Sequence, residues 1–526
     1  MTEVKAARPR AWLAGLAGAA ALATLAAPIT GASAQMQDDT IRFATQSISP
    51  GLGRPEFGTA SPGVYTLWPI YESLTRVSPQ GDVSGLLAVS WKNIDNDTWQ
   101  FTLRSGVTFQ NGKPFTAEAV VTQLNYLISD DSAGTVGHAT NKNQAKIAEA
   151  RAIDDLTVEF KTFVPNPELP RMMAGFWMPE PGQWNDLPTD EYAKNPIGTG
   201  PFQAVSYTGG VDGTVEYDAY PGAWRRAQVK HLQIIAINGN APRVAALVSD
   251  QVDIIQGVAM DSIDQIEAAG HRVDIAERPS AMGWRFMSVR KNSPFHDVRV
   301  RQAANYAIDR DSISKNLLRG ISKPVGQCAT RNTFGYNPDV KPYPHDPDKA
   351  RALLAEAGYG EGFDTEAMVL PGAFPADGEI YQIAAQQLTA VGIRVKLTNI
   401  TFAQWLDNWY GRAEGPEGTM GFSDMFQNSC HNFNAIPFDA YPNLSCRKDL
   451  PSHCNADEFA LLEQAEQEYD VEKRRQLIQQ LMVLNHENAP NLFFVELVDL
   501  TGLNKRVRNF SNTIQRFSFD TITLSN

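Results

Sequence analysis

Strand and helix signals alternate along this chain, and this alternation constrains the fold more than any other feature. Trp99, Phe101 and Leu103 alternate with polar residues, which is the period-2 pattern of a half-buried strand. The stretch 157–161 repeats that pattern. Capped helical stretches separate such strands, and mixed strands and helices pack as layers around a shared core. The sequence therefore predicts an α/β fold, and at 526 residues a single core is unexpected, so we expect two or more lobes.

Helix starts are marked by residues that cap helices well. Asp346 is the clearest case, because Pro347 fits the first helical position and Gly358 follows the expected end. Pro490 ends the last expected helix, and 492–498 is predicted to be a strand. The capping residues of the expected helices are Thr116, Asp297, Asp311, Asp346, Asn455 and Asp470.

The N-terminus has the three parts of a secretory signal peptide. Three basic residues precede an apolar run over 11–27, and a small-residue triplet follows at 32–34. We predict that residues 1–34 are removed by cleavage after Ala34, which leaves Gln35 first; an uncleaved anchor is the alternative. The first cysteine, Cys328, is far from the run, so no lipid anchor is expected. These features predict export to the periplasm without a membrane anchor.

The charge balance narrows the class of partner. The chain has 46 Lys and Arg against 59 Asp and Glu, a formal net charge of −13. This acidity favours solubility and argues against nucleic acid or an anionic membrane as partner. No basic stripe is present that could neutralise phosphates.

Four cysteines in an exported chain predict disulfides. We favour Cys446–Cys454, which closes a short loop, and Cys328–Cys430 by elimination. The alternative is a zinc site built from Cys446, His453 and Cys454 with His431 nearby, although its spacing matches no standard C-x-x-C pattern.

Known catalytic and cofactor motifs are missing from the sequence. It contains no G-x-S-x-G, H-E-x-x-H or G-x-x-x-x-G-K-[ST] pattern. Gly51-Leu52-Gly53 begins a dinucleotide-binding fingerprint, but Glu56 replaces its third glycine. We therefore expect neither a cofactor nor catalysis, although scattered histidines leave a His-based triad open.

Several short motifs, in a fixed order, carry a resemblance to a known family. We interpret two of them as fold determinants and not as ligand contacts. These are 198–202 (GTGPF) and the corner around Arg301, Asp309 and Arg310. The motifs are 70–74 (IYESL), 85–88 (GLLA), 101–104 (FTLR), 115–118 (FTAE), 198–202 (GTGPF), 294–297, 300–303 (VRQA), 307–310 (AIDR) and 346–358. Together they resemble the family 5 extracellular solute-binding proteins, the dipeptide-, oligopeptide- and nickel-binding components of bacterial ABC importers.

The resemblance implies a two-lobed clamshell with an extra subdomain and a two-strand hinge. The first lobe is expected at 35–285 plus 495–526, with the subdomain at 71–195, and the second lobe at 286–494. The hinge strands are expected near 284–289 and 492–497. A monomer of this kind captures a small solute or peptide by hinge closure and delivers it to an ABC permease in the inner membrane.

Ligand contacts are expected in loops that combine aromatic walls with a few polar groups. Asp424 fits either of two roles, pairing with a cationic ligand group or capping a turn. The candidate ligand-binding residues are Gln46, Arg54, His138, Phe334, Phe374, Trp405, Phe422, Asp424, Phe426 and Asn428.

Two departures from the peptide-binding relatives bear on the ligand. Those relatives place an arginine for the peptide carboxylate where this chain has 371–374 (PGAF), and an acidic loop for the ammonium where it has 427–432 (QNSCHN). Uncharged, amphiphilic or sugar-like ligands, and longer peptides held through their backbones, therefore stay open. Two other functions also stay open: a sensory binding protein that reports to a membrane receptor, and a periplasmic enzyme on the same scaffold.

Overall fold

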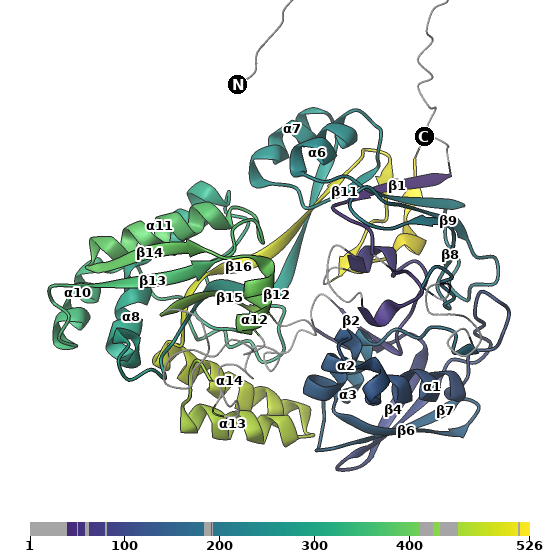
Figure 1. The fold of residues 1–526 in the computed structure, drawn as a ribbon, viewed down its shortest axis with the longest axis horizontal. Coiled ribbons are helices and arrows are strands. Elements are labelled where there is room, and N and C mark those ends of the chain that lie inside the picture. Colours follow the sequence, from purple (N-terminus) through teal and green to yellow (C-terminus); the bar gives the residue numbers. More distant parts are fainter. Residues whose placement is uncertain are drawn as a thin grey trace, which may run out of the picture. The chain divides into compact units, whose positions relative to one another are not determined.

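A ten-stranded mixed sheet forms the centre of the fold (Figure 1). The computed structural model describes residues 39–49, 51–57, 63–78, 81–182, 191, 193–409, 424–431, 446, 451–513 and 516–525. The predicted signal peptide, its cleavage site after Ala34 and Phe422 lie outside the described residues. Among the helices of the described ranges, none combines the length and apolar character needed to cross a membrane.

The ten strands follow the predicted alternation, with parallel and antiparallel neighbours. In spatial order they are β14 (Ile393–Asn399), β13 (Phe363–Val369), β15 (Met425–His431), β12 (Arg272–Phe286), β16 (Asn491–Leu503), β11 (Ile254–Gln256), β1 (Thr40–Thr45), β10 (His231–Ala236), β9 (Thr214–Ala219) and β8 (Phe202–Thr208). The α/β class is confirmed.

A separate four-stranded antiparallel sheet lies within the range predicted for the extra subdomain. Its strands, in spatial order, are β4 (Ala88–Asp95), β5 (Thr98–Leu103), β7 (Thr157–Thr162) and β6 (Ile147–Asp154). The predicted strands at 99–103 and 157–161 are β5 and β7. Their inward side chains form a hydrophobic cluster of their own with α1 (Ala117–Ile128), α3 (Leu169–Met172) and neighbouring loops.

Helices cover the large sheet and begin largely where the sequence predicts. They include α6 (Asn240–Val248), α7 (Ile263–Ala268), α8 (Val298–Ala307), α10 (Pro347–Glu356), α11 (Asp377–Ala390), α12 (Phe402–Trp409), α13 (Ala456–Gln467) and α14 (Val471–Asn488). The carboxylate of Asp346 accepts a hydrogen bond from the backbone N–H of Lys349 at 2.9 Å, which confirms the predicted cap of α10.

One predicted helix start is wrong. The short helix α9 (Arg310–Ser312) is capped by Asp309, whose carboxylate accepts from the backbone N–H of Ser312 at 2.9 Å, and not by Asp311. Arg310 is buried and donates to backbone carbonyls, among them those of Phe493 (2.7 Å) and Asn305 (2.8 Å), so its role is to join backbone segments.

The 198–202 turn is a close backbone approach. A Cβ atom at Gly198 would lie 2.0 Å from the carbonyl oxygen of Ile70, and one at Gly200 would lie 2.4 Å from that of Pro69. Such separations are impossible for real side chains, so glycine is required at both positions. This arrangement agrees with a role in the fold.

Strands β12 and β16 are antiparallel partners over most of their length. The two strands change their sheet neighbours along their length. β16 pairs with β11 at 501–503, whereas β12 pairs with β15 at 280–286, and an irregularity in the β12–β16 register falls between Glu277 and Ala281. The change of neighbours therefore lies several residues before the predicted 284–289.

Both predicted disulfides are present. Cys328 is joined to Cys430, and Cys446 to Cys454. No cysteine thiol is left over, so the alternative zinc site loses its thiolate ligands.

Candidate functional site

The strand registers show which ends of the strands meet at the crossing. On one side, β1, β10 and β11 are parallel to one another. The C-terminal residue of β11, Gln256, lies opposite Thr501 of β16. On the other side, β13 and β14 are parallel to β15, whose C-terminal residue His431 lies opposite Ser280. Both sets of carboxyl ends therefore point toward the crossing.

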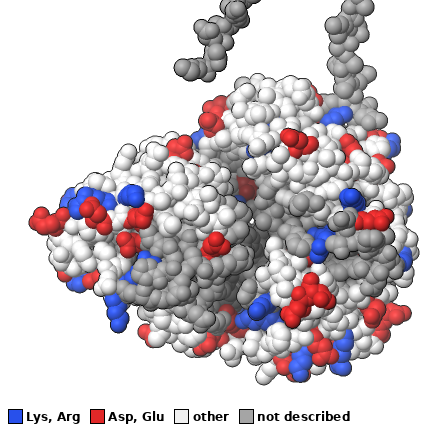
Figure 2. All heavy atoms as spheres, in the orientation of Figure 1, with Lys and Arg blue, Asp and Glu red and all other residues white. Residues whose placement is uncertain are grey.

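Ligands of open α/β sheets bind at the carboxyl ends of the strands. Figure 2 shows a hollow in the molecular surface between the part that carries β13 and β14, on the left, and the part that carries the four-stranded sheet, on the right. The described segments that follow the carboxyl ends are 46–49, 237–240 and 257–259 on one side, and 370–376 and 400–405, which includes the first turn of α12, on the other. The segment after β15 lies outside the described residues. None of the five described segments contains Asp, Glu, Lys or Arg.

Two of the predicted ligand-binding residues lie in these segments: Phe374 in the loop 370–376, and Trp405 in the first turn of α12. The indole of Trp405 is half-buried, stacks on Phe426 with ring centroids 6.3 Å apart, and donates from Nε1 to the carbonyl of Gln427 at 3.3 Å. Phe374 is also half-buried. Both side chains are thus partly exposed, which suits an aromatic wall.

Asp377, a residue that the sequence analysis missed, fixes the loop that carries Phe374. Its carboxylate is 3% exposed and accepts from the backbone N–H groups of Gly372 (2.8 Å), Ala373 (2.9 Å) and Phe374 (3.0 Å). Burial raises the pKa of Asp377, against the opposing effect of these backbone donors. The signal was present in sequence as an acidic residue at the first position of α11, following a Gly/Pro loop.

Gln46 is exposed directly after β1, at the carboxyl edge. Arg54 and His138 lie elsewhere, beside the four-stranded unit. The guanidinium of Arg54 pairs with Glu56 at 2.9 Å and reaches the hydroxyl of Tyr126 at 3.2 Å. His138 Nδ1 lies 3.0 Å from the hydroxyl of Ser132 and 3.1 Å from the carbonyl of Leu127. Both side chains are held by local contacts, and Gln46 is the more accessible of the three.

Asp424 and Phe426 are directed into the structure. Asp424 precedes β15 at the end remote from the crossing, and its carboxylate accepts from the hydroxyls of Ser293 (3.1 Å) and Thr365 (2.9 Å). Of the two roles expected for Asp424, this placement favours capping a turn over pairing with a cationic ligand group. Phe426 is 0% exposed and packs with Met287, which leaves it no surface for a ligand. The side chain of Asn428 lies outside the described residues.

Phe334 lies away from the carboxyl-end loops, in a hydrophobic cluster beside α14. Its ring faces three guanidinium groups, those of Arg171, Arg474 and Arg475, at 5.7, 5.4 and 4.6 Å from the ring centroid. The side chain of Phe334 therefore contacts arginine side chains of the protein itself.

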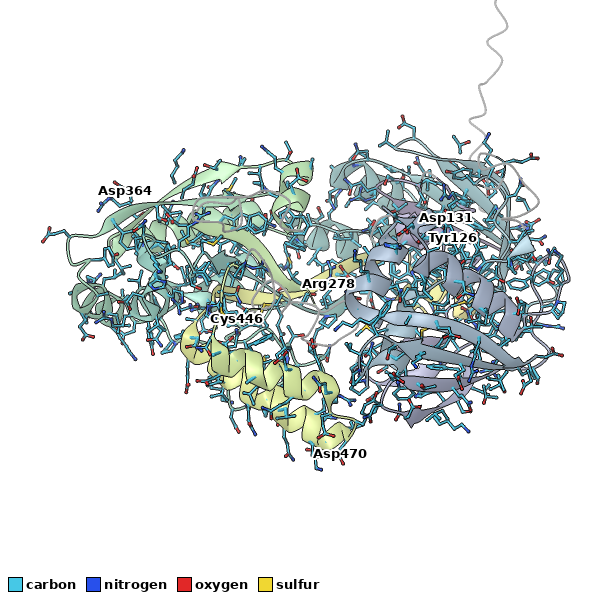
Figure 3. All side chains as sticks on the ribbon, turned by 60° about the horizontal axis from the view of Figure 1, so that its bottom comes forward. Tyr126, Asp131, Arg278, Asp364, Cys446 and Asp470 are labelled. Atoms are coloured by element: carbon cyan, nitrogen blue, oxygen red, sulfur yellow. A yellow bond between two sulfur atoms is a disulfide. The ribbon has the colours of Figure 1, made fainter. Side chains whose placement is uncertain are left out.

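A polar cluster marks the crossing of β12 and β16. Arg331 bridges the carboxylates of Glu277 on β12 (3.1 Å) and Glu496 on β16 (2.8 Å). Arg278 pairs with Asp499 at 3.6 Å, and Figure 3 shows Arg278 in the middle of the ribbon, where the two strands cross. Burial raises the pKa values of both Glu496 and Asp499.

One serine–histidine–carboxylate arrangement bears on the question of catalysis. The hydroxyl of Ser288 lies 2.8 Å from Nδ1 of His453, and Nε2 of His453 lies 3.3 Å from Glu458. All three residues are buried, with exposures of 6%, 3% and 2%. A nucleophile must reach its substrate, so this geometry supports a packing role.

A large mixed sheet whose two sets of parallel strands meet across β12 and β16 is the fold of the two-lobed periplasmic binding proteins. The family can be named as well: the model of the bacterial extracellular solute-binding proteins, family 5, matches residues 82–429. The chain belongs to this family.

Individual relatives agree with this membership. The chain is 25% identical to the dipeptide-binding protein of Escherichia coli over 91% of its own length and 93% of the relative's. It is 25% identical to heme-binding protein A of Haemophilus influenzae, with 82% of each chain covered. The periplasmic binding protein DppA from Helicobacter pylori, solved with the peptide STSA, shares the fold at a TM-score of 0.76 and 20% identity, over 93% of this chain and 98% of that one.

Proposed function

We propose that this protein is the periplasmic substrate-binding component of an ABC importer, exported with cleavage after Ala34 and working as a monomer. The first lobe comprises 35–285 and 495–526, with 71–195 as its subdomain, and the second lobe comprises 286–494. Family membership supports the transport role. The separate hydrophobic cluster of the four-stranded sheet supports the subdomain.

The lobes close by bending where β12 and β16 change neighbours, between Glu277 and Ala281. A register irregularity at that point supports the location, because bulged strands bend and twist more readily than regular ones. Ligand then selects the closed state by binding it more tightly than the open one.

The ligand is an uncharged organic solute with an apolar or ring face. The observations that carry this assignment are the absence of charged residues from the five described segments 46–49, 237–240, 257–259, 370–376 and 400–405, and the partly exposed side chains of Trp405 and Phe374. A charged ligand buried between the lobes needs a partner charge, because an unpaired charge is costly to desolvate. The charges at the β12–β16 crossing are already paired with one another, Arg331 with Glu277 and Glu496, and Arg278 with Asp499. Uncharged loops with amide and aromatic side chains suit neutral hydrogen-bonding ligands instead. The named relatives bind peptides and heme, so the family tolerates different solutes.

The experiment is mass spectrometry of small molecules released from protein purified from the periplasm, followed by thermal-shift assays with the released compound. Bound ligand raises Tm in a concentration-dependent way. Trp405→Ala is expected to reduce the shift, whereas Val205→Ala, at an exposed position on β8 at the opposite edge of the large sheet, leaves it unchanged. A charged ligand, or a shift that Trp405→Ala does not alter, contradicts the assignment.

A further inference from the structure

The pair of helices α13 and α14 makes a contact with the four-stranded unit that is separate from the β12–β16 crossing. Glu168, just before α3, and Arg474, in α14, form an ion pair with Oε1 and Nη2 2.6 Å apart. Both side chains are only 6% exposed. Figure 3 shows Asp470, the residue before α14, at the tip of the helix pair beside the strands of this unit.

Each partner of this ion pair is held in position by its own side of the contact. The other carboxylate oxygen of Glu168 binds Nε of Arg171 at 2.7 Å, one helical turn along the chain. Nη1 of Arg474 donates to the backbone carbonyl of Glu468 at 2.6 Å. The ring of Phe334 lies against both guanidinium groups. The two halves are therefore preorganised, and little side-chain entropy is lost when they meet.

Tyr469 adds a second link beside the ion pair. Its hydroxyl donates to the backbone carbonyl of Asn96 at 2.6 Å, and its ring stacks on Trp99 with centroids 6.0 Å apart. Trp99 is fixed in turn by a hydrogen bond from Nε1 to the carbonyl of Asn166 at 3.1 Å. The segment 468–474 thus carries both of these links on the α13–α14 side.

We propose that Glu168 and Arg474 are positioning residues for lobe closure: they form a buried ion pair in the closed state, separate in the open state, and so set ligand affinity without touching ligand. The inference rests on the proposed function in one respect, namely that the lobes move about the β12–β16 crossing. The apparent affinity for ligand is the affinity of the closed state multiplied by the fraction of protein that is closed. A contact that favours closure therefore raises the apparent affinity. Buried charge pairs also specify one geometry, because a misplaced partner leaves a desolvated charge uncompensated.

The test uses the ligand-free full chain. Spin labels on the variant Lys92→Cys/Glu463→Cys report the separation of the two sides by pulsed electron resonance; both positions are exposed, and the four native cysteines are in disulfides. Arg474→Glu brings two carboxylates together on closure and is expected to lower the ratio of closed to open protein by about tenfold or more. Arg475→Glu is the matched control, because Arg475 is 42% exposed and pairs with Glu472 of its own helix. It is expected to change the ratio less than about twofold.

Arg474→Met, which keeps the stem against Phe334, is expected to shift the ratio in the same direction and tests the inference if Arg474→Glu does not fold. The double variant Glu168→Lys/Arg474→Glu is expected to restore part of the closed population. A wild type with only the long separation, or equal effects of Arg474→Glu and Arg475→Glu, would overturn the inference. Because no ligand is present, a wrong ligand assignment cannot produce either result.

Discussion

Asp377 gives the sharpest test of how the loop at 370–376 is held. Replacement by alanine removes one buried carboxylate that accepts three backbone N–H groups at 2.8–3.0 Å. A hydrogen bond to a charged group contributes about 1.5–3 kcal/mol, but water can reach the exposed Gly372 and Ala373 after the substitution. We therefore expect Asp377→Ala to lower the free energy of unfolding by about 2–3 kcal/mol in total, and Asp377→Asn, which keeps one acceptor oxygen, by about half of that.

The assay is urea unfolding combined with hydrogen exchange of the loop. The amides of 372–374 are expected to exchange faster in Asp377→Ala, and ligand affinity is expected to fall because Phe374 is no longer fixed. Asp348→Asn is the control, since Asp348 also lies in the first turn of a helix, but its side chain is 92% exposed. A loss of stability under about 0.5 kcal/mol in Asp377→Ala, with unchanged exchange at 372–374, would refute the reasoning.

Three further predictions follow from particular contacts. Gly198→Ala is expected to abolish folding because of the 2.0 Å approach to the carbonyl of Ile70, whereas Gly175→Ala, which has no atom within 4 Å, leaves the yield of soluble protein unchanged; equal yields contradict this. Phe426→Ala is expected to lower the free energy of unfolding in urea by about 3–5 kcal/mol, as for a fully buried phenylalanine. A variant with weaker ligand binding but an unchanged free energy of unfolding would contradict this. Burial raises the folded-state pKa of Asp499 above its unfolded value, so the wild type gains stability relative to Asp499→Asn as the pH falls from 7 through that raised pKa. A difference between the two unfolding free energies that does not vary with pH would contradict that last prediction.

Local signals in the sequence predicted local structure well. The cap at Asp346 and the alternation at 99–103 depend on neighbours in the chain, and both agree with the structure. The exception at Asp311 has the same origin: Asp309 and Asp311 are both good caps, and the tertiary contacts of Arg310 favour the earlier start. The family resemblance supplied the two-lobed fold, but the order of the ten strands was not predicted, because local patterns do not encode which strands pair.

The candidate site was predicted less well, because ligand-facing and core aromatic residues look alike in a sequence. Phe426 and Trp405 are both large residues in or near loops, but only the strand register shows that one points inward and the other lies at a carboxyl end. The contact of Glu168 with Arg474 joins residues far apart in the chain, and nothing local marks either of them. Asp424 was ambiguous for the same reason until its two hydroxyl donors were known.

The central claim is that an uncharged solute binds between the carboxyl ends of the two sets of parallel strands. Hydrogen exchange with and without the ligand released from the native protein tests this most directly. The account predicts slower exchange on binding in 237–240 and 257–259 on one side and in 370–376 and 400–405 on the other, with the amides of Glu277–Ala281 also affected by closure. Protection confined to one side of the crossing, or located away from all of these loops, would contradict it.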